Sequence, residues 1–186
     1  VAAKLSRNLE RPRTETDGRF ARAVRLAEQD GTYRQKLEAH YEWIWTSFWW
    51  FDDIANLNGS YDAFENLVID TDHAKNIEFL CNLAQLLFNS VVHQHLTADE
   101  ANLEGRTARL SDRLKSMAAD GSRPNNALEA RTSLLVIEVN KAALKKDSQG
   151  LTALWPQFSD VIKQAKGLGE FSADRLTRMI EVFGNI

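Results

Sequence analysis

The chain has 186 residues, of which 44% are hydrophobic and 26% are charged, a balance that excludes a disordered chain. Only 9 glycines and 3 prolines interrupt it, which favours helices over sheets. The net charge of −3 is unevenly distributed, because residues 1–25 carry +4, residues 26–100 carry −10 and residues 101–186 carry +3.

Three further features bear on where the protein works and on its extent. The single cysteine, Cys81, excludes an internal disulfide, so nothing points to an oxidising compartment. No run of about 18 apolar residues is present, so we expect neither a membrane-spanning helix nor a membrane partner. The first residue is not a methionine, the N-terminus has no apolar segment typical of a secretory signal, and the last residues carry no polar tail. We therefore expect a domain of a larger cytoplasmic, intracellular protein.

Apolar residues recur at helical spacing along the whole chain, and no segment alternates as a strand would. Asn58-Gly59 is a typical signal for the end of a helix. Thr97 with Glu100 three residues later is a capping box, which begins a helix. Pro156 is expected inside a helix, where it either kinks the helix or marks its first turn. In chain order, eight helices are predicted at about residues 19–30, 33–57, 60–68, 73–95, 97–117, 127–146, 148–166 and 173–183.

The connections between these helices are short, which predicts that neighbours along the chain lie antiparallel. We therefore expect an all-α fold of stacked antiparallel helix pairs, either an α-solenoid or an irregular helical bundle. The whole chain, 1–186, is expected to be one domain. Its clearest loop, 120–126, divides it into two candidate sub-units, 1–120 and 125–186.

Two helix junctions that are 110 residues apart carry similar residues. A glycine ends the first helix, an aromatic fills the space between the helices, and a small residue lets the second helix approach. This spacing resembles that of the tetratricopeptide repeats over about residues 43–69 and 153–183. The resemblance implies stacked hairpins, although 110 is not a multiple of the family's period of about 34 residues. The matching pairs are Trp45/Trp155, Phe48/Phe158, Ala55/Ala165, Gly59/Gly169, Tyr61/Phe171 and Ala63/Ala173.

The most unusual segment is the aromatic run from Tyr41 to Phe51, which is followed by carboxylates. On a helix, Trp43 and Trp50 share one face, so the run is either a central core helix or one wall of a groove. Aromatic side chains with carboxylates suit a basic, partly apolar peptide; the alternative is a solvated acidic rim. The candidate binding residues are Trp43, Trp50, Asp52, Asp53, Tyr61, Asp62 and Glu65.

Two other patterns support alternative functions. Arg34 and His40 form an Arg-x5-His pair that resembles the motif of the HEPN ribonucleases, and the resemblance implies action on an RNA phosphodiester. Arg106, Arg109 and Arg113 form a basic stripe, which suits either nucleic acid or a salt-bridged solvent face. We expect no metal and no cofactor. The prediction that the sequence favours is a non-catalytic helical scaffold that binds a protein or a peptide.

Overall fold

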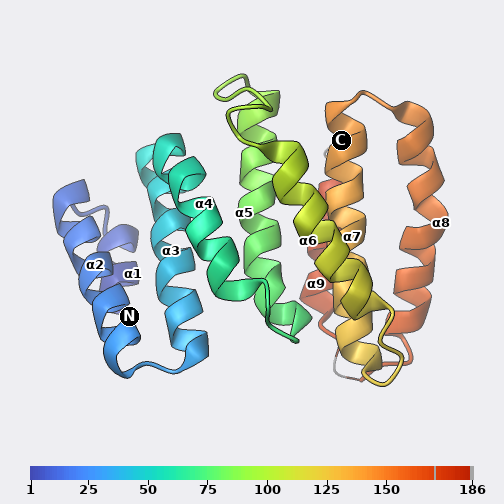
Figure 1. Ribbon diagram of the computed structural model, residues 1–186, viewed down its shortest axis with the longest axis horizontal. Coiled ribbons are helices and arrows are strands. Elements are labelled where there is room, and N and C mark those ends of the chain that lie inside the picture. Colours follow the sequence, from blue (N-terminus) through green and yellow to red (C-terminus); the bar gives the residue numbers. More distant parts are fainter. Residues whose placement is uncertain (170, 185–186) are drawn as a thin grey trace. The chain divides into compact units, whose positions relative to one another are not determined.

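The computed structural model describes residues 1–169 and 171–184, which form nine helices and contain no strand (Figure 1). The all-α prediction is therefore confirmed, and the number of helices is close to the eight expected. None of these described helices combines the length and the apolar character that crossing a bilayer requires. The chain divides into two compact units, residues 1–70 and residues 71–186, called here the first unit and the second unit.

The first unit is a set of three long helices with a short fourth helix packed on two of them. Helix α3 packs between α2 and α4, and α1 packs against both α2 and α3 (Figure 1). Phe20, Leu37, Leu57 and Phe64 are among its buried core residues. The helices are α1 (Ala2–Asn8), α2 (Arg13–Asp30), α3 (Tyr33–Phe51) and α4 (Ile54–Val68).

The boundary between α3 and α4 differs from the prediction. One helix was expected from Tyr33 to Leu57, but α3 ends at Phe51 because Asp52 adopts a left-handed conformation with φ of 51°. Asp53 then caps the N-terminus of α4. Gly59 therefore lies inside α4, and the prediction that it ends a helix is wrong. Gly169 lies in the connection between α8 and α9, so the paired glycines of the two similar junctions have different local structures.

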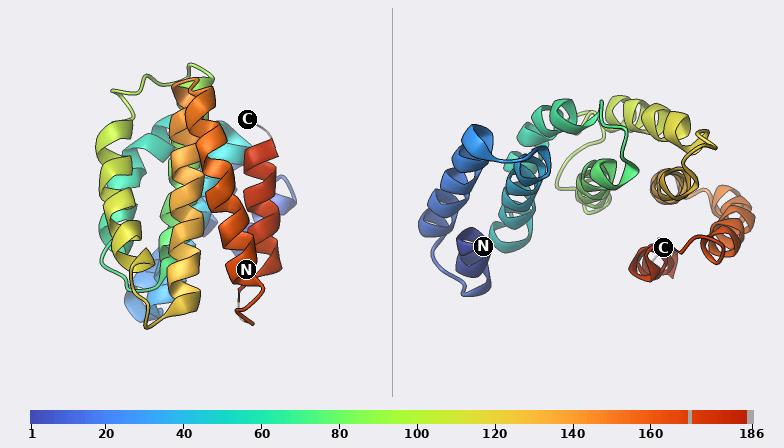
Figure 2. Two further views of the ribbon diagram at one scale, coloured as in Figure 1. Left: turned by 90° about the vertical axis from the view of Figure 1, so that its right-hand side faces the viewer. Right: turned by 90° about the horizontal axis from the view of Figure 1, so that it is seen from below.

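Helix α7 is the centre of the second unit. It packs against α5, α6, α8 and α9, and Figure 2 shows α7, α8 and α9 side by side. Residues 119–123 join α6 to α7, which begins with Pro124 in its first turn. Residues 124–126 of the predicted loop 120–126 therefore belong to α7. These helices are α5 (Ala74–Val92), α6 (Leu103–Ala118), α7 (Pro124–Leu144), α8 (Ser148–Ala165) and α9 (Ala173–Gly184).

An apolar cluster joins three helices of the second unit. Leu128 and Leu135 of α7 meet Phe158 and Val161 of α8 and Met179 of α9. Burial of side chains of this size from water is the main favourable contribution to the packing of such helices. The cluster explains why α8 and α9 lie together on α7.

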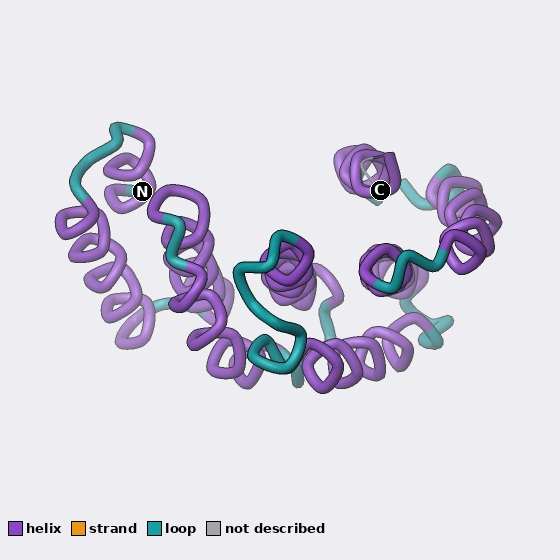
Figure 3. Tube along the Cα trace, turned by 90° about the horizontal axis from the view of Figure 1, so that it is seen from above, coloured by secondary structure: helices purple, strands orange, loops and turns teal. Residues whose placement is uncertain are grey.

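Most connections between neighbouring helices are short, whereas the one between α5 and α6, residues 93–102, is longer (Figure 3). Two local features of the chain differ from the prediction. Helix α1 was not expected at all. The predicted capping box of Thr97 and Glu100 forms, with the Thr97 amide 2.8 Å from Glu100 Oε2, but it closes only a turn, so the prediction that it begins a helix is wrong. Helix α6 begins at Leu103, after Asn102 in a left-handed conformation with φ of 42°.

Candidate functional site

The residues predicted to bind a partner do not form one surface. Tyr61 and Glu65 are buried, with exposures of 0% and 4%, so they belong to the packed interior. Trp50, Asp52 and Asp62 are exposed. Trp50 and Asp52 lie at the C-terminal end of α3, whereas Asp62 lies farther along α4. Among the predicted residues, only those at the end of α3 therefore combine an exposed aromatic side chain with an exposed carboxylate.

Trp43 and Asp53, the two other predicted residues, belong to a network within the first unit. The Trp43 indole donates to Asp17 Oδ1 at 3.0 Å, and Arg13 pairs with both Asp17 and Asp53. Partial burial opposes ionisation of Asp53, but hydrogen bonds from the Asn56 amide and from Arg13 outweigh it and lower the pKa of Asp53. The network connects α2, α3 and α4, so these side chains have structural partners already.

Arg7 covers one face of Trp50. Its guanidinium carbon lies 4.6 Å from the centre of the ring, a cation–π contact. The same guanidinium donates to Glu42 at 2.8 Å and to Thr46 at 3.2 Å. Trp50 nevertheless keeps 41% of its surface exposed. Arg7 thus fixes the short helix α1 to the C-terminal half of α3.

The candidate ribonuclease residues are each held by a different carboxylate. Arg34 Nε donates to Glu38 at 2.8 Å, and His40 Nε2 lies 2.8 Å from Glu28 Oε1. The hydrogen bond with His40 is the main reason that the pKa of Glu28 is lowered. Each side chain thus has its own acidic neighbour, and neither lines the cavity between α1, α2 and α3.

The three arginines of the basic stripe on α6 lie in different environments. Arg106 is buried and donates to the Ala101 carbonyl at 2.8 Å. Arg113 donates to the Thr71 carbonyl at 2.5 Å, and Arg109 is exposed. Two of the three guanidinium groups thus satisfy backbone carbonyls within the second unit, which is a structural use of arginine.

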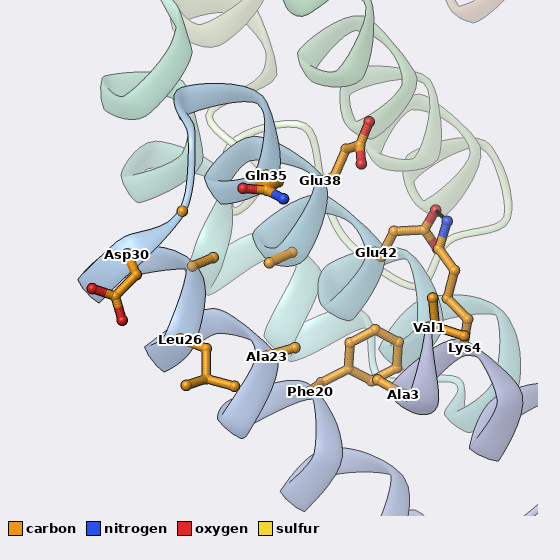
Figure 4. A pocket seen from close by; sticks show the side chains of 13 residues that line it. Val1, Ala3, Lys4, Phe20, Ala23, Leu26, Asp30, Gln35, Glu38 and Glu42 are labelled. Atoms are coloured by element: carbon orange, nitrogen blue, oxygen red, sulfur yellow. Dashed lines mark ion pairs between the residues drawn. The ribbon is translucent and has the colours of Figure 1, made fainter.

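A cavity of about 580 Å³ lies between α1, α2 and α3; we call it the first-unit groove. Figure 4 shows Leu26 and Asp30 on the side of α2, with Glu38 and Glu42 on the side of α3. The surface between them consists mainly of small side chains, so the middle of the groove is apolar and its edges are acidic. The lining residues are Val1, Ala3, Lys4, Phe20, Ala23, Leu26, Ala27, Asp30, Gly31, Gln35, Glu38, Ala39 and Glu42.

Helix α1 shows how this chain packs a helix against α2 and α3. Its small residues Ala3 and Ser6 are buried, with exposures of 6% and 0%. Its basic residues Lys4 and Arg7 both pair with Glu42 of α3. A face of small residues with flanking cations is therefore the pattern that the α2–α3 pair accepts within this chain.

In the second unit, the last helix, α9, is also held by a basic side chain that pairs with carboxylates. Arg175 of α9 donates to Glu78 at 2.9 Å and to Ser133 at 2.5 Å, and its Nε lies 3.5 Å from Glu129. Burial raises the pKa of Glu129, although the charge of Arg175 opposes this. In the same region, burial raises the pKa of the Cys81 thiol to about 12, which makes the thiol unreactive at neutral pH.

Sequence reasoning missed the residues of the first-unit groove. Ala23 and Ala27 are four residues apart on α2, and Ala39 stands on the facing helix. At helical spacing these alanines count as ordinary core positions, and nothing in the sequence indicates which face of α2 stays uncovered. The signal that could have indicated the groove is the small size of these alanines, together with Glu38 and Glu42, which lie four residues apart on α3.

Within residues 1–169 and 171–184, no three His, Cys, Asp or Glu side chains lie close enough together to hold a metal ion. Comparisons of the chain with protein-family models, with curated proteins and with solved structures find no match. The fold and the site define an all-α protein with a helix-lined, acidic-edged groove.

Proposed function

We propose that the chain is a helical protein-interaction module without chemistry of its own, and that its first unit binds a basic, partly apolar segment of another protein. The observation that carries this proposal is the first-unit groove, whose small apolar lining lies between Asp30 on one side and Glu38 and Glu42 on the other. Apolar area contributes affinity, and the surrounding carboxylates contribute steering and register.

The exposed end of α3 supports the same proposal from a second surface. Trp50 and Asp52 are exposed there, and Trp49 keeps 52% of its surface exposed. Tryptophan is among the residues that contribute most to binding at interfaces. Helix α1 lies between the groove and these side chains, since Arg7 contacts both Glu42 and Trp50, so the end of α3 is a separate contact surface for a partner.

Site-specific crosslinking tests the proposal. A photo-crosslinking amino acid replaces Leu26, which is 49% exposed at the edge of the groove, in cells that make the protein. The control carries the same group at Lys163, an exposed position on α8. We expect a discrete crosslinked protein from position 26 and not from position 163. Absence of such a protein contradicts the proposal, as does RNA cleavage by the chain that is lost in His40→Ala.

Charge reversal at the exposed carboxylates tests the steering. Asp53 is unsuitable because it caps α4 and holds Arg13, so the variant is Asp52→Lys with Asp62→Lys. With the crosslinked partner in hand, we expect slower association at low salt and a smaller difference at high salt, where exposed charges are screened. An unchanged association rate at low salt means that these carboxylates serve only as a solvated surface.

A further inference from the structure

We infer that the occupant of the first-unit groove is an α-helix of a partner protein, with small residues on its buried face and Lys or Arg beside them, docked next to α1. This inference rests on the proposed function and adds the class of partner. It follows from the dimensions of the groove, the size of its lining side chains, and the placement of its carboxylates.

The groove runs along the α2–α3 pair beside α1. Helices α2 and α3 contain 18 and 19 residues. Val1 and the α1 residues Ala3 and Lys4 line one end of the groove, and Asp30 and Gly31, at the turn between α2 and α3, line the other. The open space therefore continues along the same helix pair, where a further stretch of helix fits.

The lining favours a helix with small side chains. Ala23, Ala27 and Ala39 present only methyl groups to the groove, and helix axes approach most closely where the side chains at the contact are small. Ala3 and Ser6 of α1 use this kind of packing against α2 and α3. An occupant with leucine or phenylalanine in the same positions stands farther from the lining and loses contact with it.

The carboxylates specify cations on the occupant. Glu42 already pairs with Lys4 and Arg7. Glu38, one turn earlier on α3, pairs with the half-exposed Arg34 of its own helix, and such a surface pair is weak. Asp30, on the other side, is an exposed carboxylate at the edge of the groove. Basic residues three or four apart on an incoming helix match this arrangement.

A peptide based on the sequence of α1 provides the probe. It contains three consecutive copies of residues 2–8, AAKLSRN, which repeat the small and basic positions every seven residues, and it carries a fluorescent label. A control peptide has glutamate in place of each lysine and arginine. The free peptide is only partly helical, which weakens its binding to every protein variant alike, so comparisons between variants hold. Binding to the full chain is measured by fluorescence anisotropy.

Three proteins are compared: the unaltered chain, Asp30→Lys with Glu38→Lys, and Ala39→Leu, which fills the groove. We expect the basic peptide to bind the unaltered chain, and the acidic peptide to fail. The charge variant is expected to bind about tenfold more weakly at low salt, with a smaller loss at high salt. Ala39→Leu weakens binding at both salt concentrations, because its effect is steric.

The matched control is Asp99→Lys with Asp160→Lys, which makes the same change of charge at exposed positions outside the groove and is expected to bind the peptide nearly as well as the unaltered chain. Unchanged binding in the two groove variants overturns the inference, because the peptide then uses another surface or displaces α1. Failure of the peptide to bind also overturns it, even where crosslinking from position 26 captures a protein and the proposed function stands.

Discussion

Two adjacent aspartates divide the aromatic α3 from α4. Asp52 ends α3 with a left-handed backbone, a conformation that non-glycine residues adopt at some cost. Asp53 begins α4 by accepting a hydrogen bond from the Asn56 amide at 2.9 Å, and it also pairs with Arg13 of α2. Two residues of the same type therefore have different roles. Asp52 ends α3 through its backbone conformation, and Asp53 starts α4 through its side chain.

Asp53→Ala removes the cap of α4 and the pairing with Arg13. We expect a loss of about 1–2 kcal/mol in the free energy of unfolding at pH 7, the usual cost of losing a cap. Because the pKa of Asp53 is lowered in the folded protein, its contribution is fully present above the unfolded value of about 4 and disappears as the pH falls through the folded value. Urea unfolding of the unaltered chain and of Asp53→Ala, at pH 7 and at lower pH, measures the difference in free energy of unfolding, which is expected to shrink as the pH falls.

The neighbouring position supplies the control for this measurement. Asp52→Gly relieves the left-handed backbone, so we expect a gain of about 0.5–1 kcal/mol. A loss of stability in this variant contradicts the assignment of Asp52 as a helix end that glycine suits better.

The carboxyl group of Asp120, which is half-buried, has an unusually low pKa. Hydrogen bonds from the Ser122 hydroxyl, from Arg123 and from the Ser122 amide lower its pKa to about 2. We expect an NMR titration to find this value, and Ser122→Ala to move the pKa upward toward the ordinary range because the strongest donor is lost. An unchanged pKa in Ser122→Ala means that the remaining donors, Arg123 and the backbone amide, hold the charged form.

At the scale of helices, one arginine adds an electrostatic contact to the apolar packing of α9. Arg175 is 9% exposed and faces Glu78 and Glu129, so Arg175→Ala leaves two partly buried carboxylates without that cation. We expect a loss of about 2–4 kcal/mol at pH 7 and faster hydrogen exchange in α9. The pKa of Glu129, already raised by burial, rises further, and a raised carboxylate destabilises the fold only above its unfolded pKa.

The pH dependence separates this explanation from simple loss of packing. In Arg175→Ala the deficit is expected to shrink as the pH falls from 7 to about 5, because Glu129 takes up a proton in the folded state. Arg178→Ala is the matched control, since Arg178 is 65% exposed and lies 3.6 Å from Glu78. A deficit in Arg175→Ala that does not change with pH argues against the electrostatic account.

The helices with long apolar periods were predictable, whereas features set by single residues or by packing were not. Gly31 ends α2 and Thr32 with Gln35 caps α3, which agrees with the predicted break at this point. Helix α1 was missed because seven residues give too short a period to recognise. The uncovered side of α2, and with it the groove, depends on how α1, α2 and α3 pack together, which periodicity along one helix does not specify.

For the whole molecule, the relevant observation is that each unit has its own buried core. Phe20 belongs to the first unit and is 2% exposed, and Leu128 belongs to the second and is 1% exposed. We expect Phe20→Ala, which costs about 3–5 kcal/mol, to speed hydrogen exchange in α2 and α3 while α7 stays protected. Leu128→Ala is expected to do the reverse. Equal loss of protection in both units in either variant means that they unfold as one.

The contact of α1 with Glu42 has a consequence for competition. Only residues 9–12 separate α1 from α2, so its cations are held near Glu42 at an effective concentration on the order of millimolar. A free helix that targets the place of α1 must exceed this local concentration, and ordinary cellular concentrations fall short of it. The stretch of groove beside Asp30 and Glu38 lies away from the paired cations Lys4 and Arg7, so a partner that binds there does not have to displace α1.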